Sequence, residues 1–235
     1  MKIAVISDIH LGRGDRSDQF GHDDADFVRF LRYLEGDFER IVLLGDVYET
    51  LASPVPMAQV QELDAIRAAH PEIIKRFDAP QYTYLHGNHD LVTRHVAAAP
   101  SQLSLEVDGK RLLFTHGHGY DLINRRAPWI AEWSVWLGHW VSRVGLAGVY
   151  RFFDRVDRFL RSLKIDPRKA TFEDWAMALG TQRKADVVVT GHTHEARRDQ
   201  RGGRLFLNSG TCAEGKFEFL TIDTRRDEYA LHTSW

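Results

Sequence analysis

Five short polar segments of this sequence each follow an apolar run and carry carboxylate, amide or imidazole side chains. They read SDIHLG, LGDVYE, GNHD, THGH and TGHTH in chain order. A single segment of this kind is more often a turn or a cap than a ligand site, but five at successive strand ends indicate a shared site. The candidate metal ligands are Asp8, His10, Asp46, Asn88, His116, His192 and His194.

These donors indicate which ions the site would hold. Oxygen and imidazole ligands without a thiolate favour Mn, Fe or Zn over calcium or a sulfur-bound structural zinc, and they leave the choice among the three open. Seven donors are too many for one ion and suit two. Two ions ~3.5–4 Å apart need a bridging carboxylate, for which we expect Asp46, and such a pair clamps both oxygens of a phosphoryl displacement.

Short strands would position these segments. Eight runs rich in β-branched and aromatic residues, bounded by Gly, Asp, Asn or Pro, predict strands. Helical spacing predicts one helix around residues 27–34 and a second from Val60 through Ile74, while VDGK after Leu105 predicts a hairpin turn. The order β-α-β-α-β, followed mostly by strands, favours an α/β fold with two sheets packed face to face. Ligands bind at the carboxyl ends of strands in such sheets, so the donors would converge there.

Composition limits the alternatives. The chain has 235 residues, of which 43% are hydrophobic, enough for one sizeable core, and we expect one domain over residues 1–235. A net charge of −2 argues against a general nucleic-acid binder, because no broad basic field is present. Cys212 is the only cysteine, which excludes an internal disulfide framework and favours the cytoplasm.

The five segments resemble the motifs of the calcineurin-like metallophosphoesterases: Asp-x-His, Gly-Asp, Gly-Asn-His-Asp/Glu, a lone His and Gly-His-x-His. All five occur here in the family's order, from Asp8 to His194. The resemblance implies a four-layer αββα sandwich of two mixed sheets flanked by helices, with a dinuclear centre in the loops at one edge. It assigns Asp8, His10, Asp46 and His194 to one metal, and Asp46, Asn88, His116 and His192 to the other.

The resemblance also implies a mechanism, in which a metal-bound hydroxide attacks phosphorus in line. His89 would contact the substrate and act as general acid, and Glu49, three residues after the bridging Asp46, would orient it. We expect Gly87 to allow a tight turn. Two roles remain open for Asp90: it contacts His89 as a second partner, or it caps the short helix that follows.

Two further residues are candidate substrate contacts. Arg13 lies in the polar loop at 13–18 and could reach a phosphate, although most such loops are only solvated. His118 lies near the site in sequence, with contact to substrate and packing within the loop as equal alternatives.

A helical, lid-like insertion is predicted over residues 121–182, where a plain catalytic sandwich needs only a short link. Its tryptophans follow the spacing i, i+4, i+7 and i+11 and form one helical stripe. Between residues 121 and 170, Lys and Arg number 10 and Asp and Glu number 5. Four roles for this stripe remain open. It would pack the insertion on the catalytic sandwich, hold a lipid-linked substrate, contact the inner face of an anionic membrane, or form a dimer interface. Its members are Trp129, Trp133, Trp136 and Trp140.

The aromatic and basic insertion is similar to that of the UDP-2,3-diacylglucosamine pyrophosphatase branch of the family. That branch has Arg where this chain has His89, which leaves a broader phosphomonoesterase or phosphodiesterase open. We therefore expect a hydrolase of a small-molecule, nucleotide-linked or lipid-linked phosphate. The alternatives are a phosphoprotein phosphatase and a non-catalytic metal-binding scaffold on the same fold.

Overall fold

Ten strands form two five-stranded sheets within the residues that the computed structural model describes, which are 1–120, 136 and 171–235. The first sheet contains, in spatial order, β10 (Glu228–His232), β9 (Phe219–Asp223), β1 (Lys2–Ile6), β2 (Arg40–Leu44) and β3 (Tyr82–Leu85). The second contains β4 (Gln102–Val107), β5 (Lys110–Thr115), β6 (Val187–Thr190), β8 (Arg204–Ser209) and β7 (Ala196–Arg201). Both are mixed: β1–β2–β3 and β5–β6–β8 run parallel, β9 is antiparallel to both of its neighbours β1 and β10, and β4 and β7 are antiparallel to β5 and β8.

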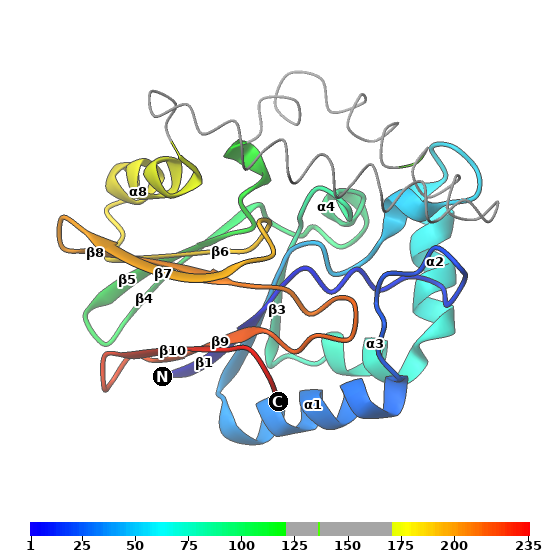
Figure 1. Ribbon diagram of the computed structural model, residues 1–235, viewed down its shortest axis with the longest axis horizontal. Helices are drawn as coiled ribbons and strands as arrows, with labels where there is room; N and C mark the ends of the chain where they lie inside the picture. The colour runs from blue at the N-terminus through cyan, green and yellow to red at the C-terminus, as the bar shows by residue number, and fades with distance from the viewer. Residues whose placement is uncertain (121–135, 137–170) are drawn as a thin grey trace.

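Helices flank both sheets (Figure 1). The described helices are α1 (Asp24–Asp37), α2 (Gln59–Ala69), α3 (Pro71–Phe77), α4 (Thr93–Val96) and α8 (Phe172–Gln182), with 3-10 turns at Thr50–Ala52 and His118–Tyr120. Side chains define where two of them begin. Asp23 caps α1 by accepting from the Ala25 amide, and Thr171 forms a reciprocal capping box with Asp174 at α8.

The alternation of side chains along the strands produces the layers. On β1, Ile3 and Val5 face the core between the two sheets, while Ala4 and Ile6 face the core beneath α1 and α3. On the other side, α8 packs its Ala176 against the second sheet. The order helices, sheet, sheet, helix confirms the predicted α/β sandwich.

Local predictions were wrong in two places. The predicted second helix is two helices, α2 and α3, because Pro71 cannot donate a backbone hydrogen bond within a continuing helix and instead starts α3. Strands β7 and β10 were not predicted. Strand β7, ARRDQR, is polar and mostly exposed, while β10, EYALH, buries Tyr229 and Leu231 only partly, since both strands lie at sheet edges.

The predicted insertion at 121–182 lies mostly outside the described residues. Its last part is α8, which is a helix as expected and packs on β6 and β8. The tryptophan stripe lies outside the described residues except for Trp136, whose Nε1 donates to the Ser53 carbonyl at 2.9 Å. No helix in the described ranges is long and apolar enough to cross a membrane.

Candidate metal centre

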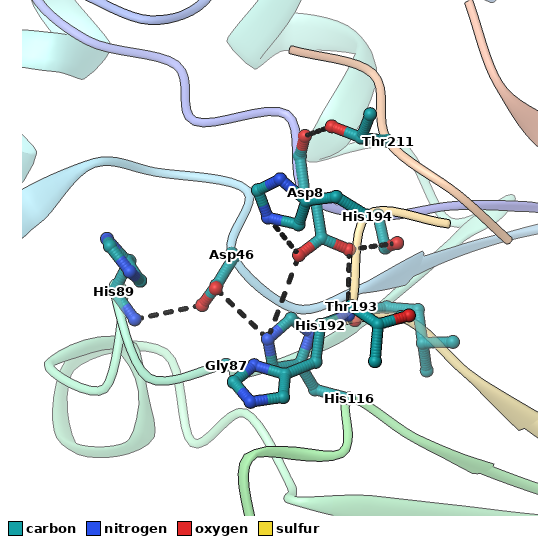
Figure 2. Close-up of polar contacts among 12 residues, drawn as sticks. Asp8, Asp46, Gly87, His89, His116, His192, Thr193, His194 and Thr211 are labelled. Carbon is teal, nitrogen blue, oxygen red and sulfur yellow. Dashed lines mark hydrogen bonds and ion pairs between the residues drawn. The ribbon is translucent and has the colours of Figure 1, made fainter. Parts of the chain in front are cut away.

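The loops that leave β1, β2, β3, β5 and β6 meet at one edge of the sandwich and bring six of the seven predicted ligands together, five of which are labelled in Figure 2. Two donor triads form there. Within each triad the ligand atoms lie within 4.8 Å of one another. The first triad is Asp8, His10 and His194, and the second is Asp46, His116 and His192.

Both carboxylates divide their oxygens between two tasks. Asp8 Oδ2 accepts from Ser7 Oγ at 2.5 Å and from the His192 amide at 3.0 Å, while Asp8 Oδ1 lies 3.2 Å from His194 Nε2. Asp46 Oδ1 accepts from the His89 amide at 2.8 Å, while Oδ2 lies 3.0 Å from His116 Nε2. One oxygen of each therefore fixes the backbone of another loop, and the other faces the imidazoles.

Hydrogen bonds at the far side of two rings direct their Nε2 atoms inward. His116 Nδ1 donates to the Leu44 carbonyl at 2.9 Å, and His10 Nδ1 contacts Glu49 Oε2 at 2.8 Å. His10 Nε2 and His194 Nε2 then lie only 3.4 Å apart. Metal-binding histidines in proteins are oriented in this way by a partner on the second ring nitrogen.

Burial and mutual charge perturb the ionisation of these groups. Burial would raise the pKa of Asp8, but the neighbouring His116 and His194 outweigh it and hold the pKa at about 2. Burial would likewise lower the pKa of His116, whereas Asp46 and Asp8 raise it to about 9. The cluster therefore attracts positive charge strongly, and divalent ions would displace its protons.

Unsatisfied polar atoms supply an independent test of metal binding. Among the described residues, the buried polar atoms without a well-formed hydrogen bond include Asp8 Oδ1, Asn88 Oδ1 and His116 Nε2, although the first and the last make imidazole–carboxylate contacts with His194 and Asp46. Such atoms are rare in native proteins and call for an ion or another partner. All three belong to predicted ligands, so the donor set fits divalent metal ions.

A third cluster places the predicted acid beside its predicted positioning residue. His89 Nδ1 lies 2.8 Å from Glu49 Oε2, the same oxygen that contacts His10. Glu49 is fully buried, whereas the His89 side chain remains 18% exposed and open to a substrate. Burial would lower the pKa of His89, but Glu49 and Asp46 raise it to about 10.

The backbone of the centre is unusual. Five candidate ligands have left-handed backbone conformations, at φ values of 51° for Asp8, 48° for His10, 49° for Asp46, 72° for His192 and 58° for His194. Gly87 does not, so the tight turn expected of it is not the reason for glycine there. A Cβ at Gly87 would overlap Asp46 Oδ1, and one at Gly191 would meet Ser7 Oγ and Asp8 Oδ2. These glycines make room for the carboxylates.

Asp90 has neither of the roles considered from sequence. Its Oδ2 accepts from the Val47 amide at 2.7 Å and from the Tyr84 hydroxyl, and its Oδ1 accepts from the Gly87 amide at 2.6 Å. Asp90 is fully buried and ties the loop after β2 to the loop after β3. We call this arrangement the Asp90 clamp.

Support for Asp8 also comes from a segment that the sequence reasoning missed. Thr211 Oγ1 donates to the Asp8 carbonyl at 2.9 Å, and Asn208 Nδ2 donates to the Gly191 carbonyl at 2.6 Å. Both lie in NSGT, which follows the apolar run of β8. The signal was therefore the same as in the five motifs, a polar segment at the end of an apolar strand.

The two predicted substrate contacts differ in their surroundings. Arg13 Nε donates to Glu62 Oε1 at 2.8 Å, and a second contact joins the same side chains, so the guanidinium is already engaged with α2. His118 is half-buried, with its ring 5.7 Å from that of His116. Burial and the nearby His116 lower the pKa of His118 to about 3, which makes it a neutral group. Their contact with substrate stays a prediction.

Comparison with known proteins identifies relatives. The family described as "Calcineurin-like phosphoesterase superfamily domain" matches residues 1–139. UDP-2,3-diacylglucosamine hydrolase of Ralstonia nicotianae is 25% identical over 237 residues, covering 88% of this chain and 82% of that one. The protein of the same name from Blochmanniella pennsylvanica is 24% identical over 213 residues, covering 83% and 80%. Vps29 of Entamoeba histolytica, crystallised with zinc, is 16% identical, with 97% and 89% coverage and a TM-score of 0.49.

Proposed function

Because the chain belongs to the calcineurin-like phosphoesterase superfamily, we propose that it is a two-metal phosphoesterase that hydrolyses a phosphate ester or pyrophosphate. The observation that carries this proposal is the pair of donor triads at one edge of the sandwich. Asp46 would be shared between the ions. The other ligands would be Asp8, His10 and His194 for one ion, and Asn88, His116 and His192 for the other.

Two divalent ions of the Mn, Fe or Zn type would supply Lewis acidity, which activates water near neutral pH and neutralises charge on phosphoryl oxygens. The protein's own contribution centres on His89. Glu49 engages Nδ1, so Nε2 is the ring nitrogen left to donate a proton to the leaving oxygen. Despite burial, the charge of Glu49, which is not a proposed ligand, raises the pKa of His89 and favours the protonated ring, and the imidazolium also attracts the phosphate.

For the substrate we propose a nucleotide-linked or lipid-linked pyrophosphate. The support is the similarity to two UDP-2,3-diacylglucosamine hydrolases, each about one quarter identical over more than four fifths of this chain. His89, where that branch of the family has Arg, leaves a simple phosphodiester as the second substrate class. Both residue types offer a cation to phosphate, but only His also transfers a proton readily near pH 7.

The first experiment tests the centre itself. Asp46→Asn removes the charge of the shared carboxylate, and we expect loss of bound metal together with loss of Mn-dependent hydrolysis of bis-nitrophenyl phosphate. Asp37→Asn, at an exposed position on α1, is the matched control and should retain both. Metal content is measured beside turnover. Full metal binding and full turnover in Asp46→Asn would contradict the two-metal proposal.

The second experiment assigns the substrate. The whole chain is loaded in turn with Mn, Co and Zn and given a nucleotide diphospho-lipid, a simple phosphodiester and a phosphopeptide. We expect the highest kcat/KM for the nucleotide diphospho-lipid. A preference for the phosphopeptide supports a protein phosphatase instead, and a metal-loaded protein inactive on all three supports a non-catalytic scaffold.

A further inference from the structure

A large cavity lies beside β3, away from the donor triads. Its volume is about 580 Å³. It is lined by residues of α2, the end of α3, β3 and the α4 segment, which lie on one side of the molecule (Figure 1), and it is partly open to solvent. None of its lining residues is a candidate ligand of the metal centre or one of its predicted substrate contacts. Cavities of this size commonly hold small organic ligands. We call it the aromatic cavity.

Aromatic rings form much of its wall. Tyr48 and Tyr84 lie with ring centroids 6.0 Å apart, and Phe77 and Tyr82 lie 5.7 Å apart. Leu43 and short aliphatic residues of the α4 segment complete the lining. An apolar ring system of a ligand would be buried here, and the electron-rich faces of the tyrosines would attract a cation.

The charged residues of the lining favour the same class of ligand. The charged residues of the lining are two carboxylates, Asp64 and Asp78, and one guanidinium, that of Arg67. Arg67 is already engaged with Asp78 at 2.8 Å. Asp64 is exposed on α2 and has no salt bridge within the described part of the chain. The lining thus carries one excess negative charge, which attracts an ammonium group and repels an organic carboxylate.

The wall of the cavity is also part of the Asp90 clamp. The Tyr84 hydroxyl donates to Asp90 Oδ2, and the Tyr48 amide approaches the same oxygen at 3.3 Å. Asp90 in turn holds the amides of Val47, which follows the proposed shared ligand Asp46, and of Gly87, which lies two residues before the proposed acid His89. A ligand that shifts either tyrosine therefore acts on both catalytic loops through one buried side chain.

From this arrangement we propose that the aromatic cavity binds a small organic amine with an aromatic or alicyclic body, and that its occupancy changes the rate at the metal centre. The body packs among the tyrosines, and the ammonium group lies at Asp64. The binding part stands on the cavity alone. The effect on rate rests on the proposed phosphoesterase function.

Three probes with one ring system test the ligand class on the metal-loaded full chain. They are 2-naphthylethylamine, 2-naphthylethanol and 2-naphthylacetate, which carry a cation, a neutral group and an anion. We expect calorimetry to show the amine binding about tenfold more tightly than the alcohol, with the carboxylate weakest. Asp64→Asn should remove most of that preference. Equal binding of amine and alcohol, or tighter binding of the carboxylate, overturns the assignment.

Filling the cavity tests the place of binding. Val96→Trp fills it from α4 and Ala97→Phe from the residue that follows α4, and each should weaken amine binding by at least about tenfold. Val60→Trp is the matched control, because Val60 is 46% exposed, against 56% for Val96, and does not line the cavity. Unchanged binding in both filled variants places the ligand elsewhere and overturns the proposal.

Turnover provides a second, separate readout. The amine should change hydrolysis of bis-nitrophenyl phosphate by the wild-type protein at least about twofold and leave the filled variants unaffected. Unchanged turnover at saturating amine overturns the coupling to the metal centre. A protein that binds the amine but hydrolyses nothing instead refutes the proposed function, while the binding assignment stands.

Discussion

The metal centre and the aromatic cavity meet at Asp90 but are built on opposite principles. The centre gathers buried carboxylates and imidazoles on left-handed backbone, with polar atoms that lack hydrogen bonds among the described residues. The cavity is walled by aromatic rings on a strand and helices, with its charges at exposed or half-buried positions. The metal centre thus combines unfavourable electrostatic and backbone energies, whereas the aromatic cavity contains unfilled apolar space.

The difference indicates how each region depends on a ligand. Left-handed conformation costs on the order of 1–2 kcal/mol per non-glycine residue, and the crowded donors are stable together only when positive charge is held among them. The centre is thus organised for ions whose binding offsets these costs. The cavity requires no ligand to satisfy polar groups, so its occupant would adjust the fold rather than complete it.

The largest effect on catalysis is expected from substitution of His89, whose partly exposed side chain can contact a substrate. His89→Ala should lower kcat for bis-nitrophenyl phosphate about 10²–10⁴-fold, because it removes the proton donor. Metal content should be unchanged, since His89 is not one of the proposed ligands of either ion, although it shares with the proposed ligand His10 a contact to Glu49. His95→Ala, an exposed histidine on α4, should retain full turnover. Turnover of His89→Ala within a few-fold of wild type would exclude His89 as the acid.

A smaller effect is expected at Glu49, which contacts the proposed ligand His10 and the proposed acid His89 through one oxygen. Glu49→Gln keeps the shape but removes the charge, and we expect kcat to fall about 10–100-fold with little change in KM. Glu49→Asp, which restores the charge, should recover part of the rate. The control is Glu35→Gln, which changes a partly buried glutamate of α1 that pairs with Arg76 of α3. Its kcat should match that of the wild-type protein. A change confined to stability would make Glu49 structural only.

The sequence predicted the features that depend on local pattern. Apolar runs ending in Asp, Asn or His identified the donor loops, and VDGK identified the turn between β4 and β5, where Asp108 and Gly109 have φ values of 50° and 75°. Strand β7 was missed because its polar sequence produces no apolar alternation, and β10 because its half-buried apolar residues, Tyr229 and Leu231, are too few to form a clear pattern.

Features set by distant contacts could not be read in this way. Asp90 is joined to the Val47 amide across 43 residues of sequence, and Gly87 is required by the carboxylate of Asp46. The left-handed backbone at the ligands is likewise imposed by tertiary structure, since Asp and His occur in many conformations. Function could therefore be predicted from ligand types, whereas the clamp needed coordinates.

The smallest predicted effect concerns the boundary between the two regions, where strand β3 offers a matched pair. Tyr82 and Tyr84 both line the aromatic cavity, and each hydroxyl donates to a carboxylate. Tyr84 bonds to Asp90, which is fully buried, whereas Tyr82 bonds to Glu35, whose side chain is 22% exposed. Replacing either by Phe keeps the ring in the cavity wall and removes only the hydroxyl.

Tyr84→Phe should lower the free energy of unfolding by about 1–3 kcal/mol, because it takes a donor from a buried carboxylate. It should also lower kcat several-fold by loosening the loops that carry Asp46 and His89. Tyr82→Phe should cost about 1 kcal/mol or less and leave kcat unchanged, since water can replace a donor at a partly exposed carboxylate. Urea unfolding and steady-state kinetics of both variants measure these differences.

Comparing the changes in kcat and stability between Tyr84→Phe and Tyr82→Phe tests whether Asp90 couples the cavity to the metal centre. A loss of rate in Tyr84→Phe alone means that the cavity wall and the catalytic loops form one mechanical unit joined at Asp90. Loss of stability without loss of rate in Tyr84→Phe would mean that Asp90 holds the fold but not the geometry of the centre, because the backbone amides of Val47 and Gly87 then suffice to position both loops. In that case a ligand in the cavity would have no route to the metal centre through this residue.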